Sequence, residues 1–456
     1  MEIEFSEHVA HRGRCRWAPS GDSLAHISEA SSKNVVFRDP QSLKLLREIR
    51  CDHTISNIVW SPHSEKLLLQ FQKTGEIWIW SFVEKKWIAE IRMDPEIARV
   101  PTWSPKGDAI LSTCSIGTNL AIWPLDGTNP ILIEAVKGPS KGIKFSNNGK
   151  YLAVAYRKGF EDTIQIISTN DWSVVHEFST GTENLEDFIW SADDRFFICW
   201  DTPCNFKLEV FSMEGSMVKS VDTERCAMGI RSLAISPSQK LLSVGSYDEC
   251  LRFWNTLTWE FITEIEHLLV IDTEETQIFI EDSFEVGFHT NRKQSTYSIG
   301  EIPFSIETKK TTNNQENQKS MTGTKILKWS PCGSFFVSQL EELPNLLWVW
   351  DKSSWSLISV IENDRAIVCA EWCPEPSTPI LSFCCNSGHV YFWTPETCSI
   401  IDIPKRKFAA KLLRWNADGS SCAVIDKNSF FLCYLPADEY EEEEEVEEED
   451  EDEEEE

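Results

Sequence analysis

The segment Trp103-Ser104-Pro105-Lys106-Gly107 decides the fold, because the same short turn recurs along the chain. Serine or asparagine opens the turn, proline sets φ at the second position, and glycine accepts the conformation at the exit. Nine copies occur, and their anchor residues are Trp17, Trp60, Trp103, Phe145, Trp190, Ile235, Trp329, Trp372 and Trp415. Successive anchors lie 43, 43, 42, 45, 45, 94, 43 and 43 residues apart. A period in the low forties is typical of four-stranded propeller blades.

A second apolar landmark follows each anchor by 19 to 22 residues and is expected to end the third strand of its blade. These landmarks are Phe37, Trp80, Trp123, Ile167, Phe211, Trp254, Trp350, Trp393 and Tyr434. Four further tryptophans, which are expected to open outer strands, are Trp87, Trp172, Trp259 and Trp355. Short β-rich runs alternate with Gly, Pro, Asn and Asp, so we predict an all-β chain. Its tryptophans are expected to pack blade against blade rather than to form a ligand cage.

The two ends of the chain predict how the propeller closes. The ninth unit, from Leu412 to Tyr434, provides only three strands. The alternating segment Glu2-Ile3-Glu4-Phe5-Ser6 has no blade of its own. We therefore expect it to be the missing outer strand, joining the last blade to the first and leaving no open edge. The prediction is a single WD40-like ring of about nine blades.

The 94-residue interval before Trp329 is the irregular part of the repeat. Residues 267–324 contain strand-like pieces at Gln277–Glu281 and Ser295–Ile306 and a polar stretch at Lys309–Gly323. They form either a long insertion or a degenerate tenth blade. We favour an insertion, because neither the turn nor a tryptophan occurs in them. The expected domains are a propeller over residues 1–437 and a separate tail over 438–456.

The charge distribution bounds the partners. The 456-residue chain has a formal net charge of −30, and 17 of the 19 residues from Asp438 to Glu456 are acidic. Such a block repels itself and buries nothing, so we expect a disordered tail. It is either a solubilising appendage or a docking arm for a basic protein surface. The acidic balance argues against nucleic acid and anionic membranes as partners, because both attract clustered lysine and arginine.

The sequence predicts neither a secreted nor a membrane protein. The N-terminal residues lack an apolar leader, and no apolar stretch approaches the ~20 residues that span a bilayer. The 15 cysteines are scattered without a C-x-x-C pair, which favours free thiols in a reducing compartment. A cytoplasmic protein is therefore expected.

No motif predicts catalysis. Gly138-Pro139-Ser140-Lys141-Gly142 matches the G-x-S-x-G nucleophile elbow, but that elbow needs a following helix, and here a predicted strand follows. His8, His11 and Cys15 are spaced as a conceivable metal site without a second ligand pair. Phosphate-loop, zincin and dinucleotide-binding motifs are absent from the sequence. We expect a non-enzyme with no catalytic residues, no bound metal and no cofactor.

Three passages resemble WD40 blades: Gly245-Ser-Tyr-Asp248, Leu251-Arg-Phe-Trp254-Asn255 and Trp348-Val-Trp350-Asp351. They are similar to the turn between the second and third strands and to the terminal Trp-Asp of those blades. The match is incomplete, because Gly388-His389 falls at the wrong turn for the usual Gly-His pair, and Asp52-His53 is the nearest substitute.

From its N-terminal strand to about Leu435, the chain resembles the centrosomal and spindle-pole WD-repeat family typified by WD repeat-containing protein eight. The matching passages include Ile3–Glu7, Val59–Pro62, Trp103–Pro105, Gly229–Ser238, Leu242–Asp248, Thr258–Glu264, Asn345–Asp351 and Leu357–Glu362. The resemblance implies a non-catalytic adaptor at microtubule-organising centres. It would bind a coiled-coil anchoring protein of the SSX-interacting family, with a minus-end-directed kinesin in fungi, and would support spindle and cilium assembly. It assigns no contact residues and is silent on the tail.

Two other functions remain open from the sequence. An acidic tail on a WD-like ring is also compatible with a histone-binding or chaperone-type propeller in the nucleus. A ring of about nine blades is also similar to the propellers of translation-initiation factors, which would place the protein on ribosomes.

Overall fold

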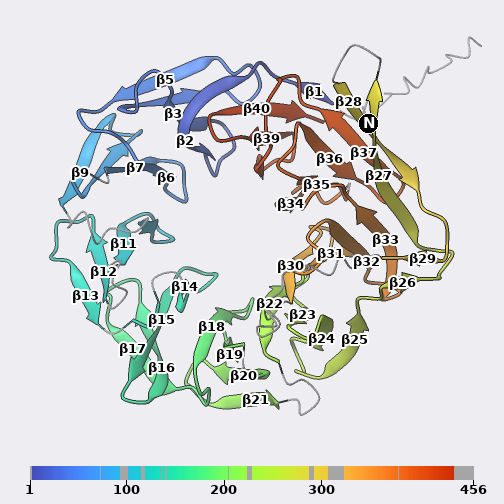
Figure 1. Cartoon of the computed structure of the whole chain (residues 1–456). Helices are drawn as coiled ribbons and strands as arrows, with labels where there is room; N and C mark the ends of the chain where they lie inside the picture. Colours follow the sequence, from blue (N-terminus) through green and yellow to red (C-terminus); the bar gives the residue numbers. More distant parts are fainter. Residues whose placement is uncertain are drawn as a thin grey trace, which may run out of the picture.

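The computed structural model is built of strands arranged around a circle (Figure 1). It describes residues 3–71, 73–92, 101–113, 119–134, 136–138, 141–203, 205–222, 228–286, 292–306, 323–377 and 379–435. Within these residues no helix is long and apolar enough to cross a membrane. The acidic tail and most of the polar stretch at Lys309–Gly323 lie outside them.

The strands form nine units, which we number as blades 1 to 9. Blade 1 contains β2 (Val9–Trp17), β3 (Leu24–Ser28), β4 (Asn34–Arg38) and β5 (Leu45–Arg50). Blade 2 contains β6 (Asn57–Trp60), β7 (Lys66–Phe71), β8 (Glu76–Ser81) and β9 (Lys86–Arg92). Blade 3 contains β10 (Thr102–Trp103), β11 (Ala109–Thr113), β12 (Asn119–Pro124) and β13 (Ile131–Glu134). Blade 4 contains β14 (Ile143–Phe145), β15 (Tyr151–Lys158), β16 (Glu161–Ser168) and β17 (Val174–Ser179). Blade 5 contains β18 (Leu185–Trp190), β19 (Phe196–Asp201), β20 (Lys207–Ser212) and β21 (Met217–Asp222). Blade 6 contains β22 (Ile230–Ile235), β23 (Leu241–Ser246), β24 (Cys250–Asn255) and β25 (Phe261–Glu266). Blade 7 contains β30 (Thr324–Trp329), β31 (Phe335–Leu340), β32 (Leu346–Asp351) and β33 (Ser356–Glu362). Blade 8 contains β34 (Cys369–Trp372), β35 (Leu381–Cys384), β36 (His389–Trp393) and β37 (Cys398–Asp402). Blade 9 contains β38 (Leu412–Trp415), β39 (Ser421–Ile425) and β40 (Ser429–Tyr434). Each blade is an antiparallel meander in which consecutive strands pair.

All nine anchors end the first strand of a blade, and all nine landmarks lie in a third strand, so the predicted register is confirmed. The turn after Trp103 shows why the motif recurs. The Gly107 amide donates to the Ser104 carbonyl at 2.9 Å, and the Ser104 hydroxyl accepts from the Ala109 amide at 3.0 Å. Gly107 has φ of +67°, which glycine adopts at little cost.

The prediction for the four further tryptophans was wrong in detail. Only Trp87 lies in an outer strand, β9. Trp172, Trp259 and Trp355 lie in the preceding hairpin turn, with φ of 56°, 55° and 55°. Leu43 and Lys85 occupy the equivalent positions, with φ of 52° and 54°. The turn geometry, and not a particular residue type, is therefore what these blades share.

The tryptophan anchors link each blade to the one before it. The indole nitrogen of Trp60 donates to the Arg16 carbonyl, one residue before the anchor of the preceding blade. The same bond recurs from Trp17, Trp103, Trp190 and Trp372 to the carbonyls of Arg414, Val59, Lys144 and Lys328, at 3.0, 3.1, 3.0 and 3.2 Å. The indole nitrogens of Trp329 and Trp415 instead donate to the hydroxyls of Ser243 and Ser382. These hydroxyls in turn donate to the carbonyls of Ala234 and Glu371, which lie one residue before the anchors of the preceding blades.

The core is divided among the junctions between blades. Nine clusters of buried apolar residues occur in the described part of the chain, and each is shared by two neighbouring blades. One of them joins blade 9 to blade 1, through Leu432 and Phe430 on β40 and Val9 and Leu24 on β2 and β3. The succession of contacts therefore returns from the last blade to the first.

The N-terminal strand completes blade 9, as predicted. Strand β1 (Glu4–Phe5) pairs antiparallel with β40, with Glu4 opposite Tyr434 and Phe5 opposite Cys433. The Ser6 amide donates to the Leu432 carbonyl at 2.9 Å. Strand β2 begins on β40 as well, with Val9 opposite Phe430, before it continues as the first strand of blade 1. In Figure 1 strands β1 and β40 thus lie side by side.

The irregular interval forms no four-stranded blade within the described residues, which supports an insertion. Strands β26 (Val270–Ile271) and β29 (Phe304–Ser305) pair at its base. Strands β27 (Gln277–Val286) and β28 (Arg292–Ile299) form a hairpin. β27 pairs in parallel with β33, so the described part of the insertion widens the sheet of blade 7 along its outer edge.

Candidate binding surfaces

The residues weighed as chemical sites are not assembled into one. Gly142 leads directly into β14, so no helix follows the G-x-S-x-G segment, and Pro139 and Ser140 lie outside the described residues. His11 and Cys15 are buried near blade 9, whereas His8 is exposed and its ring lies 6.0 Å from that of Phe431.

One group of potential metal ligands is found in the described part of the chain. It comprises Cys250, Glu264 and Glu266, whose ligand atoms lie within 4.8 Å of one another. The guanidinium of Arg252 already pairs with Glu264 at 2.8 Å, which supplies a cation to this group.

The WD40-like passages form buried polar networks. Arg252 is 5% exposed and donates to Asp248 at 2.6 Å, to Glu264 at 2.8 Å and to the Ser246 hydroxyl at 2.6 Å. In blade 7 the indole nitrogen of Trp350 donates to Ser338 at 2.8 Å. Each of these polar groups is already hydrogen-bonded to another group of the protein. We therefore assign the networks a structural role.

His267 completes the second network, and sequence reasoning missed it. Its Nε2 lies 2.8 Å from the Ser338 hydroxyl, and its Nδ1 lies against the Glu249 carbonyl. The insertion hides it, because it separates His267 from strand β30 of the blade that it serves. His53, the nearest substitute in the sequence, lies beside Glu76 with its ring 6.2 Å from that of Trp78, and His389, which falls at the wrong turn, lies beside Asp402.

Two buried histidines predict an acid-sensitive fold. Burial lowers the pKa of His267, and separately that of His26, to about 4. In the unfolded chain each takes up a proton near pH 6.5, whereas in the folded chain each stays neutral down to about pH 4. The unfolded state therefore binds more protons, and stability falls as pH drops from 6.5 toward 4, by up to about 3 kcal/mol per histidine.

The check is the free energy of unfolding of the wild type and of His267→Gln, measured from pH 7 to 4.5. The variant is expected to be less stable at pH 7 and to lose less stability on acidification. Parallel curves would show that His267 takes up no proton on unfolding.

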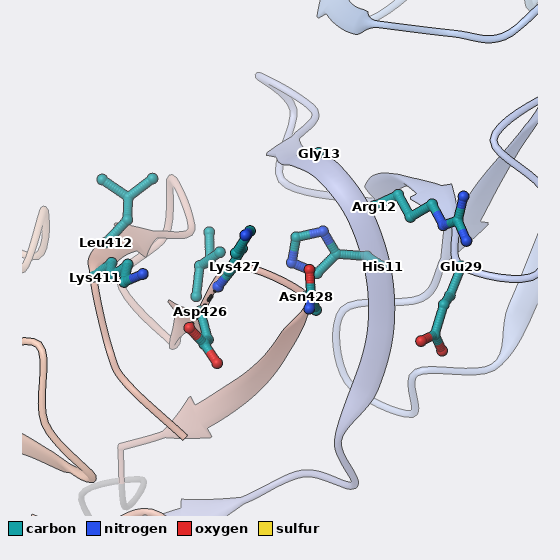
Figure 2. A pocket seen from close by; sticks show the side chains of 10 residues that line it. His11, Arg12, Gly13, Glu29, Lys411, Leu412, Asp426, Lys427 and Asn428 are labelled. Atoms are coloured by element: carbon teal, nitrogen blue, oxygen red, sulfur yellow. Dashed lines mark hydrogen bonds between the residues drawn. The ribbon is translucent and has the colours of Figure 1, made fainter. Parts of the chain in front are cut away.

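A cavity lies where blade 9 meets blade 1. It has a volume of about 750 Å³. Its lining residues are His11, Arg12, Gly13, Glu29, Lys411, Leu412, Ile425, Asp426, Lys427 and Asn428. Figure 2 shows the His11 ring reaching from β2 toward the hairpin at Asp426–Asn428, with Arg12 and Glu29 on the other side of the strand. A second cavity of about 320 Å³ shares Gly13, Leu412 and Ile425 with the first and adds Cys15, Arg16 and Arg414.

Two other features distinguish the surface. The hairpin between β15 and β16 carries Phe160 at its tip, and this side chain is 93% exposed. The insertion is fastened to blades 7 and 8 by Glu281, which is 6% exposed. Its carboxylate accepts from the Tyr391 hydroxyl at 2.9 Å, from Asn363 at 3.0 Å and from the Asp364 amide at 3.1 Å. These contacts hold the described strands of the insertion against blades 7 and 8.

The fold, the turn motif and the polar networks define a WD-repeat propeller. No family model matches the chain. Over 454 residues, 96% of this chain and 97% of the relative, it is 29% identical to the WD repeat-containing protein WRAP73 of Mus musculus. This similarity along the whole chain agrees with the resemblance to a WD-repeat family.

More distant matches agree on the fold. The chain is 21% identical over 450 residues to an uncharacterized WD repeat-containing protein of Schizosaccharomyces pombe, covering 92% of this chain and 90% of that one. A diphthine methyltransferase homolog of Dictyostelium discoideum is 28% identical over 221 residues, or 46% of this chain and 51% of that one.

Two solved structures are similar in fold alone. The C-terminal WD40 domain of Sif2 gives a TM-score of 0.51 at 13% identity, covering 95% of this chain and 99% of that one. A eukaryotic initiation factor gives a TM-score of 0.55 at 10% identity, covering 88% and 90%.

Proposed function

We propose that the protein is a non-catalytic scaffold that binds other proteins at the centrosome or spindle pole. The observation that carries the proposal is the similarity to WRAP73, which extends over 96% of the chain rather than over one blade. A binding role also fits the architecture. The buried residues hold neighbouring blades together, and the loops of this rigid scaffold remain available for contacts.

The partner we propose is a coiled-coil anchoring protein of the SSX-interacting family, with a minus-end-directed kinesin as a further component. Through them the protein would tether microtubule minus ends and support spindle and cilium assembly. This part rests on the family resemblance, since no described residue identifies the partner. The exposed Phe160 and the surface of the insertion are the features from which we would begin mapping contacts.

We favour this function over the nuclear and ribosomal alternatives. The likeness to an initiation factor is 10% in identity and concerns the fold alone. The methyltransferase homolog matches less than half of this chain. Neither therefore carries an activity over to this protein.

The test is to tag the chain at its own locus, image it, and identify the proteins that co-purify with it. Centrosomal foci together with a coiled-coil centrosomal protein would support the proposal. Nuclear signal with histones, or diffuse signal with ribosomal proteins, would replace it with one of the two alternatives.

The tail gives a prediction about microtubules. Its 17 carboxylates create a negative field that decays over about 8 Å at physiological salt. Because microtubule surfaces are acidic as well, direct binding through the tail is opposed, and a link should need a basic adaptor or motor. We expect that the purified protein does not sediment with microtubules, with or without residues 438–456. Pelleting of the full-length chain alone, lost on removing the tail, would contradict this.

A further inference from the structure

Two segments far apart in this acidic chain are strongly basic. Residues 8–17 and 403–428 together contain nine lysines and arginines against two carboxylates, a formal charge of +7 in a chain of −30. We call the six cations Arg12, Lys405, Arg406, Lys407, Lys411 and Lys427 the basic junction.

The fold brings the segments that carry these cations together, with Arg12 on the opposite side of β2 from His11 (Figure 2). The His11 amide donates to the Asn428 carbonyl at 2.9 Å, next to both Arg12 and Lys427. The Lys411 amide donates to the Ile425 carbonyl at 3.0 Å. The ammonium group of Lys405 donates to the Ser429 hydroxyl at 3.1 Å, one residue beyond Asn428. Arg12, Lys411 and Lys427 line the 750 Å³ cavity.

The basic junction differs in its charge pairing from three other junctions. Between blades 4 and 5, 6 and 7, and 7 and 8, cations face acids: Lys144 with Asp187 at 2.8 Å, Arg231 with Glu341 at 2.7 Å, and Lys328 with Glu371 at 2.8 Å. Within the described residues, by contrast, Arg12, Lys411 and Lys427 form no ion pair, and neither does Arg414 in the adjoining cavity. Glu29 and Asp426 are the acids that line the cavity.

A buried polar group also faces this cavity. His11 is 0% exposed and lines it, and neither ring nitrogen has a hydrogen-bond partner in the structure. Burial lowers the pKa of His11, while the charge of Asp426, its backbone and that of Ser429 oppose the shift. The cavity thus offers cations without ion-pair partners, alongside Glu29 and Asp426, and a buried imidazole in its wall, which suits an acidic peptide.

The chain itself carries such a peptide close by. The segment from Asp438 to Glu456 begins three residues after Leu435, which follows β40 of blade 9. β40 begins beside the cavity, at Ser429, so Leu435 lies about 20 Å away along the strand. The 21 residues beyond Leu435 can extend about 70 Å. Tethering gives a segment of this length a high effective concentration at a site it can span.

We propose that the basic junction binds the acidic segment 438–456 of the same chain. The segment neutralises the cations between blades 9 and 1. Any acidic partner must then compete with it, and the contact weakens as salt rises.

The test is carbodiimide coupling of the full-length protein, which joins a carboxylate to a lysine in contact with it, followed by peptide mass spectrometry. Tail carboxylates are expected on Lys411 and Lys427. Exposed Lys219 and Lys240, on blades 5 and 6, are the matched controls and should couple at least about tenfold less. Replacing Arg12 and Arg414 by glutamine keeps the reporter lysines but should reduce coupling severalfold, whereas Lys219→Gln with Lys240→Gln should not. Coupling should also fall severalfold in 0.5 M salt, as expected from screening.

Mixing unlabelled chains with isotopically heavy chains separates the occupants. Light–light and heavy–heavy products alone support binding within one chain. Mixed products would show the tail of a second copy and overturn the proposal. Equal coupling at Lys219, Lys240, Lys411 and Lys427, or none at the last two, would overturn it as well.

Discussion

Replacing Trp329 by alanine is expected to lower the free energy of unfolding by about 3–5 kcal/mol, the usual cost of deleting a buried tryptophan. Trp329 is 8% exposed and lies in the cluster between blades 6 and 7. Its ring centroid lies 5.0 Å from that of Phe336, and its indole nitrogen donates to Ser243 at 2.9 Å. The substitution removes the ring contacts and leaves a void at the junction where the insertion interrupts the repeat.

Trp329→Phe is the matched control, since it keeps most of the aromatic contact and removes the indole donor. It should cost about 1 kcal/mol. Denaturant unfolding followed by circular dichroism measures both variants. A loss below about 1 kcal/mol for the alanine variant would mean that this tryptophan is not part of the core, and a role in surface contact would then have to be considered.

Removing residues 1–7 should lower the melting temperature by about 3–5 °C, since the lost strand and apolar packing cost about 3–5 kcal/mol and each kcal/mol corresponds to about 1 °C in a chain of 456 residues. The deletion takes away β1 and its pairing with β40. It also removes Ile3 and Phe5, which pack against the cluster between blades 8 and 9. The outer edge of β40 would then be exposed to solvent, which is the liability that a paired edge avoids.

Glu4→Ala serves as the control, because Glu4 is exposed and its strand would remain paired. It should melt close to the wild type. A truncated chain that melted within about a degree or two of the full-length protein would show that β1 does not hold the last blade to the first.

The sequence was informative where one residue type has one local role. The turn after each anchor carries some of the serine, asparagine, proline and glycine residues that such a corner uses, and so the anchors marked the end of every first strand. The alternating segment around Phe5 and the short ninth unit were likewise enough to predict the pairing of β1 with β40. The last blade lacked an outer strand, and the N-terminal strand had no blade of its own.

Other features depend on positions that only the folded chain brings together. Trp60 reaches a carbonyl 44 residues earlier, and only the folded chain shows that it accepts this bond. His267 serves blade 7 from the far side of an insertion. The parallel pairing of β27 with β33 leaves no sequence signature, since parallel and antiparallel edges use the same residues.

The candidate surface between blades 9 and 1 illustrates the same limit. The run Lys405-Arg406-Lys407 alone is too short to indicate a site. Its importance arises only because Arg12 and Lys427, more than 400 residues apart, line one cavity. The pairing of β1 with β40 was predictable from the sequence. The cavity nearby was not, because it depends on the positions of the flanking loops.

The most direct measurement of the account is binding between the purified full-length chain and a purified coiled-coil anchoring protein of the SSX-interacting family, by titration calorimetry at physiological salt. The central claim predicts a stoichiometric complex with a micromolar or tighter dissociation constant, weakened when the β1 deletion loosens the ring and unchanged in Glu4→Ala. Absence of any heat of binding by a folded chain would contradict the assignment of this WD-repeat protein as a centrosomal scaffold.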